Sequence, residues 1–114
     1  MTKLARKTCV PCVGNVPPLT GDKVDQLLAD LDHWSAEKGH HLTKTFRFPD
    51  FARALAFVNR VGAIAEEQDH HPDIHLSWGR VRLDIWTHKI DGLTENDFIL
   101  AAKIDLLVNG AAPS

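Results

Sequence analysis

The feature that most constrains the fold is a long helical pattern that a proline must end. Asp50 follows Pro49 as a suitable N-cap, and the apolar residues after it recur at helical spacing. They form two adjacent stripes: Phe51, Leu55, Val58, Gly62 and Ala65 in one, and Ala54, Phe57, Val61 and Ile64 in the other. This width predicts burial on two sides, against a sheet and against another subunit. Pro72 disfavours helical backbone at His71, so the helix is expected to end at the histidine pair.

Alternating apolar and polar residues on both sides of this helix predict strands. Before it, residues 41–48 follow a turn at 37–39 and place three apolar side chains on one face: Leu42, Phe46 and Phe48. After it, residues 74–78 and 81–88 alternate about a tight turn at Gly79-Arg80. The pattern indicates two hairpins, each half-buried.

Two further helices complete the order. Thr20 is a suitable N-cap for a helix that ends near Asp32, and Thr94 with Asp97 fits a capping box that begins the last helix. The order is helix, two strands, helix, two strands, helix. Because hairpins replace a β-α-β rhythm, we expect an antiparallel sheet and an α+β fold, with the helices packed on one face. One domain, residues 19–110, would lie between tails at 1–18 and 111–114.

Composition excludes some classes of protein. The 114 residues are 44% hydrophobic and 25% charged with a net charge of −2, which does not suggest a nucleic-acid binder. No apolar run approaches the ~18 residues of a membrane span, and no secretory signal opens the chain. A cytoplasmic location is therefore expected.

The two cysteines, Cys9 and Cys12, form a single C-x-x-C in a basic segment broken by prolines. A four-cysteine zinc site needs a second pair, and a redox C-x-x-C would lie where a strand meets a helix. We therefore interpret this segment as an ordinary tail.

Residues 66–78, EEQDHHPDIHLSW, concentrate histidines beside acidic residues. Glu66 and Glu67 each lie four positions before a histidine of the pair, so each carboxylate is expected to reach an imidazole. Histidine titrates near neutral pH, which suits general acid–base catalysis.

Two alternatives stay open at this point. A metal site could draw on four side chains: His70, His71, His88 and Asp97. Their spacing matches no zinc pattern, and Pro72 breaks the helix between His71 and His75. The cluster could also be a polar helix end that carries imidazoles.

The run from Glu66 to Asp105 resembles the pterin-4a-carbinolamine dehydratase family. The motif reads Glu66, three residues, His70-His71-Pro72, then five residues to Trp78. Thr87-His88 follows, and then LTENDF with its aspartate, Asp97. The preceding strand and long helix, FRFPDFARALAFVNRVGAIAEE, also look like the family's, and the resemblance covers roughly residues 20–108.

The resemblance implies a four-stranded antiparallel sheet with three helices on one side, assembled as a dimer or tetramer. It implies dehydration of 4a-hydroxytetrahydropterin to the quinonoid dihydropterin, without metal or organic cofactor. This reaction recycles the pterin used by aromatic amino-acid hydroxylases.

The resemblance also implies roles for residues. His70 and His88 would be the acid–base pair, and His71 would bind and orient the pterin. The substrate-binding residues would be Glu66, Asp69, Thr87 and Asp97. Glu66 is equally well interpreted as an electrostatic partner of His70, and Asp97 as a capping acid without a catalytic role. Trp78 is expected in the core, and Trp86 at the pocket or a subunit contact.

A second class of function also fits this resemblance. Some relatives act as binding partners: a dimerisation cofactor for a transcription factor in animals, and an assembly factor for a carbon-fixing enzyme in some bacteria. The assembly factors depart from the active-site set, which is intact here. The sequence therefore favours the enzyme.

Overall fold

The computed structural model describes residues 4–9 and 17–109. Its elements are a 3-10 helix η1 (Leu4–Arg6), α1 (Gly21–Leu28), β1 (Ser35–Glu37), β2 (His41–Arg47), α2 (Phe51–Gln68), β3 (Asp73–Ser77), β4 (Arg80–Ile85) and α3 (Glu95–Asn109). After η1 the order is α-β-β-α-β-β-α, which confirms the α+β prediction.

The four strands form one antiparallel sheet in the order β1-β2-β4-β3. Leu42 lies opposite Ile85 and Phe46 opposite Val81, so the apolar residues of neighbouring strands share one face. The buried side chains of β4 are the alternate ones, Val81, Leu83 and Ile85. This matches the predicted alternation, because successive side chains of a strand point to opposite faces.

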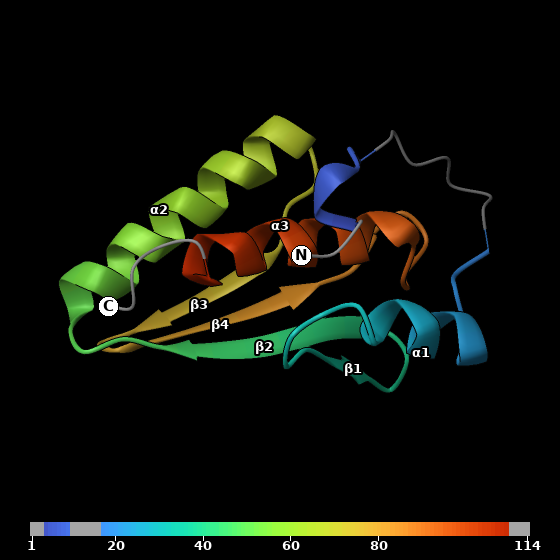
Figure 1. Cartoon of the computed structure of the whole chain (residues 1–114), viewed down its shortest axis with the longest axis horizontal. Coiled ribbons are helices and arrows are strands. Elements are labelled where there is room, and N and C mark those ends of the chain that lie inside the picture. The colour runs from blue at the N-terminus through green and yellow to red at the C-terminus, as the bar shows by residue number, and fades with distance from the viewer. Residues whose placement is uncertain (1–3, 10–16, 110–114) are drawn as a thin grey trace.

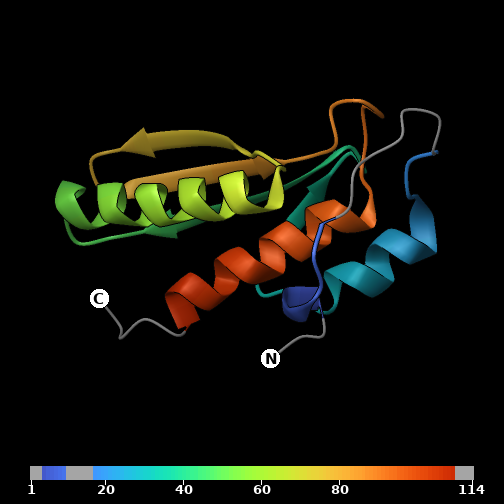
Figure 2. The same ribbon diagram turned by 90° about the horizontal axis from the view of Figure 1, so that it is seen from above.

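The helices pack on this apolar face (Figures 1 and 2). Helix α3 lies between α2 and α1, and α1 also contacts β1. Residues from Phe98 to Ile104 of α3 are buried apart from Lys103, because the sheet, α2 and η1 surround this helix. None of the helices among the described residues is long and apolar enough to cross a membrane.

The two stripes of α2 have different surroundings. Ala54, Phe57 and Val61 are buried, whereas Phe51 and Leu55 are 43% and 40% exposed. One stripe therefore covers the sheet, and much of the other is left open.

Trp78 is 68% exposed, so the prediction that it lies in the core is wrong. Strand β3 ends at Ser77, and Trp78 begins the turn into β4. The alternation that half-buries Ile74 and Leu76 therefore no longer decides where the tryptophan points.

A buried polar group joins the sheet to α3. Lys44 lies on the inward face of β2, and its Nζ donates to Asp105 Oδ1 at 2.8 Å. Trp34 Nε1 donates to the same oxygen at 3.0 Å. Because the side chains of Lys44 and Asp105 are only 13% and 8% exposed, this pair is shielded from solvent.

Helix α2 ends earlier than predicted. Its N-cap is Asp50, whose Oδ1 accepts the Arg53 amide at 2.8 Å, but the helix stops at Gln68 instead of at the histidine pair. Asp69 adopts the left-handed conformation with φ of 52°, and the His70 amide donates to Ala65 O at 3.1 Å. This is the closure typical of a Schellman motif, and it ends the helix before Pro72 can.

The N-terminal segment contacts the rest of the fold more than the sequence suggested. Residues 1–18 were expected to form a tail, yet Leu4 and Ala5 are buried against α3. Lys103 Nζ donates to Ala5 O at 2.9 Å. The tail boundary at residue 18 stays a prediction, and Cys12 and residues 111–114 lie outside the described residues.

Candidate active site

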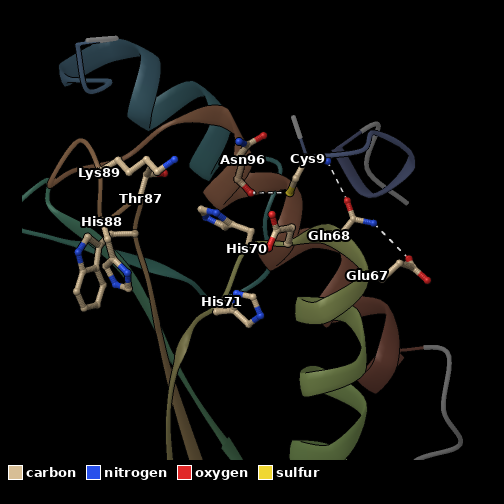
Figure 3. Close-up of a pocket in the computed structure, with 11 residues that line it drawn as sticks. Cys9, Glu67, Gln68, His70, His71, Thr87, His88, Lys89 and Asn96 are labelled. Carbon is tan, nitrogen blue, oxygen red and sulfur yellow. Dashed lines mark hydrogen bonds between the residues drawn. The ribbon is translucent and has the colours of Figure 1, made fainter. Parts of the chain in front are cut away.

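Four parts of the fold meet around a cavity of about 490 Å³ (Figure 3). The end of α2 contributes Glu67–His71, and the turn after β4 contributes Trp86–Lys89. Cys9 and Asn96 complete the lining. The predicted residues Asp69, His70, His71, Thr87 and His88 all belong to this lining.

His70 is held by a buried carboxylate. Its Nε2 lies 2.6 Å from Asp97 Oδ1, and the two side chains are 12% and 0% exposed. An ionised carboxylate only accepts hydrogen bonds, so His70 Nε2 carries the proton of this contact. In the neutral imidazole, Nδ1 then has the free lone pair and is the nitrogen able to take up a proton.

Asp97 also caps the N-terminal end of α3. Its Oδ2 accepts the Thr94 amide at 2.8 Å and the Thr87 hydroxyl at 2.9 Å. The N-terminal end of a helix favours a negative charge, which stabilises the buried carboxylate. Asp97 is therefore a capping acid, as the sequence predicted, and it is also the partner of His70. Its role as a substrate-binding residue stays a prediction.

His71 pairs with Glu66 instead of Glu67, through Nε2 and Oε2. The predicted pairs Glu66–His70 and Glu67–His71 are wrong, because α2 ends at Gln68 and both histidines leave the helical spacing. The side chains of His71 and Glu66 are 52% and 78% exposed, and ion pairs this exposed contribute little to stability. Glu66 itself does not line the cavity.

His88 lies on the exposed turn after β4, and its ring packs edge-on against Trp86 with centroids 4.4 Å apart. Trp86 also approaches His40 and His41, at 5.4 and 5.9 Å. The prediction that Trp86 borders the pocket or a subunit contact holds for the pocket. The sequence did not single out His40 and His41, which lie far from the motif along the chain.

The sequence also missed Cys9, Gln68 and Asn96 as residues of the cavity. Gln68 and Asn96 lie within or beside the motif, where their neighbours could have pointed to them. Cys9 gave no such signal, because nothing in a sequence shows that its segment returns to α3.

The described part of the chain contains no candidate metal-binding site. No group of three or more histidine, cysteine, aspartate or glutamate side chains there is arranged to hold a metal ion. The Nε2 atoms of His70 and His71 instead contact carboxylates.

Comparisons with known proteins agree on one family. The family model described as pterin 4 alpha carbinolamine dehydratase matches residues 17–107. A protein of Rubrobacter xylanophilus named "Putative pterin-4-alpha-carbinolamine dehydratase" is 56% identical over 94% of this chain and 100% of its own length. A Rickettsia bellii protein of the same name is 53% identical over 93% of this chain and 95% of its own.

Two solved structures are also similar. A transcriptional coactivator/pterin dehydratase from Brucella melitensis is 32% identical, with a TM-score of 0.74, over 79% of this chain and 97% of that one. A pterin dehydratase-like protein, described as a RuBisCO assembly factor in the alpha-carboxysome, is 28% identical with a TM-score of 0.52. That match covers 59% of this chain and 77% of the other.

Proposed function

The chain belongs to the pterin 4 alpha carbinolamine dehydratase family, and on this premise we propose that it is a hydro-lyase acting on a pterin 4a-carbinolamine. The substrate is 4a-hydroxytetrahydrobiopterin and the product quinonoid dihydrobiopterin. The observation that carries the proposal is the His70–Asp97 pair at the cavity. The contact with Asp97 fixes the tautomer of the His70 imidazole. The cavity that this imidazole lines is within the usual size range of ligand pockets.

The reaction needs two proton transfers. The C4a–O bond breaks and the hydroxyl leaves as water after gaining a proton, while N5 loses its proton and a C4a=N5 double bond forms. His70 Nδ1 is suited to take up or return one proton, and His88 across the cavity serves the other transfer. Positioned acid–base groups of this kind each contribute about 10²- to 10⁴-fold in rate.

The remaining site residues bind and orient. His71 lies next to His70 on the cavity lining and is proposed to position the pterin ring, as are Asp69 and Thr87. Glu66 and Asp97 act through the histidines that they contact. No metal or organic cofactor takes part in this proposal.

The test is stopped-flow decay of the carbinolamine with each histidine variant. His70→Ala or His88→Ala should lower turnover by about 10²-fold, on the order of 2.7 kcal/mol of transition-state stabilisation. His71→Ala should act mainly by raising KM. If the two donors serve opposite faces of the pterin, each single variant spares one C4a stereoisomer, and only the double variant loses both.

His75→Ala is the matched control, since His75 is exposed and pairs with Asp84 away from the cavity. Near wild-type turnover of both stereoisomers in all three cavity variants would contradict the catalytic assignment. A wild-type protein that does not accelerate carbinolamine decay would contradict the function itself.

We further propose that the protein is a cytoplasmic homodimer or homotetramer that serves an aromatic amino-acid hydroxylase. The exposed stripe of α2, with Phe51 and Leu55, supports self-association, because burying these apolar side chains in a subunit interface would stabilise an oligomer. A monomer in sedimentation at micromolar concentration would contradict the oligomer.

A non-catalytic binding function is the second candidate. Similarity to a coactivator/dehydratase and to a dehydratase-like assembly factor supports it. The exposed side chains of Trp78 and Phe51 would then serve a different protein instead of a second copy. An inactive protein that forms a stoichiometric complex with such a partner would favour this candidate over the enzyme.

A further inference from the structure

The cavity wall beside His70 is completed from the other end of the chain. Residues 4–9 are held on α3 by the burial of Leu4 and Ala5 and by Lys7, whose Nζ lies 2.7 Å from Glu95 Oε2. Cys9, the last residue of this segment, lines the cavity. The segment therefore brings one side chain to the site from outside the family motif.

Cys9 is held from two sides. Its amide donates to Gln68 Oε1 at 2.8 Å, and its thiol donates to Asn96 O at 3.5 Å. Figure 3 shows both contacts, with His70 beside them. Because Gln68 and Asn96 also line the cavity, these two hydrogen bonds fix Cys9 relative to its neighbours in the cavity wall.

Cys9 is an uncharged side chain near neutral pH. Burial raises the pKa of its thiol to about 11, Lys103 opposes this, and the negative charge of Asp97 adds to it. A thiol of this kind is a poor nucleophile, since the thiolate is the reactive form. What Cys9 offers the site is therefore a small neutral surface.

Building on the proposed dehydration, we propose that Cys9 is a specificity-determining residue for the pterin. Its small side chain, positioned by Gln68, leaves space beside His70 for the substituent at C6 of the ring. A larger side chain at this position would remove that space and weaken binding of the larger substituents first. The chemistry at C4a would be less affected, because the His70–Asp97 contact does not involve Cys9.

The kinetic experiment compares Cys9→Phe with Thr8→Phe in the full chain. Thr8 is exposed and does not line the cavity, so it controls for an added aromatic ring in the same segment. Cys9→Phe should raise KM about 10-fold for the carbinolamine with a dihydroxypropyl group, less for the 6-methyl analogue, and change kcat by less than about 3-fold. Equal KM values in Cys9→Phe and wild type would overturn the proposal.

If Cys9→Phe does not fold, as judged by thermal unfolding, Gln68→Ala takes its place. This variant removes the acceptor of the Cys9 amide and should also raise KM for the larger substrate. Wild-type KM in Gln68→Ala would then overturn the proposal.

A second measurement does not depend on turnover. In a Cys12→Ser protein, iodoacetamide reacts with Cys9 alone, and 7,8-dihydrobiopterin should slow this reaction by about 10-fold at saturation if Cys9 lines its site. Protection without dehydration would refute the proposed function and leave the specificity role standing. Dehydration without protection would refute the specificity role alone. The absence of both would refute both.

Discussion

Replacing Asp97 with asparagine should switch the tautomer of His70 while preserving the shape of the site. The carboxylate accepts hydrogen bonds from the Thr94 amide, the Thr87 hydroxyl and His70. The asparagine carbonyl can keep the first two donors, which places its NH₂ group against His70 Nε2. Since an NH₂ group donates, Nε2 must become the acceptor, and the proton moves to Nδ1.

The magnitude follows from these contacts. Three charge-assisted hydrogen bonds become neutral ones or are rearranged, which should lower the free energy of unfolding by about 2 kcal/mol. His70 Nδ1 can then no longer accept a proton, so turnover should fall by about 10²- to 10⁴-fold, or about 2.7 to 5.4 kcal/mol. The catalytic loss should therefore equal or exceed the loss of stability.

The assays are urea unfolding, stopped-flow carbinolamine decay, and ¹⁵N NMR of the His70 ring. Asp105→Asn is the matched control, because Asp105 is also a buried carboxylate but bonds Trp34 and Lys44 away from the cavity. It should lower stability and leave turnover near wild type. Wild-type turnover in Asp97→Asn, or an unchanged Nε2–H tautomer, would refute the reasoning.

Three further predictions follow from other residues. Gly79→Ala should lower the free energy of unfolding by about 1 to 3 kcal/mol in urea titration, because its Cβ would lie 2.7 Å from Phe48 O; wild-type stability would contradict this. Burial raises the pKa of Cys9 from 9.0 to about 11, so the folded protein holds this proton more tightly than the unfolded chain. The free energy of unfolding should therefore decrease as pH rises from 9.0 toward about 11, and Cys9→Ala should lessen that decrease. Dehydration should survive exhaustive chelator treatment, and activity lost with chelator and restored by Zn²⁺ would show that a metal is needed.

Local patterns predicted the fold well, because alternation and capping act between near neighbours. Strand β4 buries the residues that its alternation marked, and Asp50 caps α2 as expected. The sequence could not predict the exact last residue of α2. Pro72 disfavours helical backbone only at the residue before it, so the helix can end at any earlier position. In the structure, α2 ends at Gln68 because Asp69 adopts the left-handed conformation.

The family motif contains five of the residues that line the cavity, Asp69, His70, His71, Thr87 and His88, but the helical spacing predicted the wrong partners for the two adjacent histidines. The family motif named His70, His71 and Asp97, yet the helical spacing assigned His70 to the wrong carboxylate. Its true partner lies 27 positions away, across a contact that only the packing of α3 against α2 creates. Cys9 lies still farther along the sequence from its contacts in the cavity wall, 59 positions from Gln68 and 87 from Asn96. No periodic sequence pattern predicts contacts at such separations.

The left-handed residue at the end of α2 gives two adjacent histidines different freedom. Asp69 turns the chain so that His70 meets a buried carboxylate, whereas His71 meets Glu66 in solvent. His70 has therefore lost its rotamer entropy during folding, before any ligand arrives. His71, with half of its side chain in water, can still change rotamer on the picosecond-to-nanosecond timescale of exposed side chains. A ligand that enters the cavity would thus find one imidazole in place and order the other as it binds.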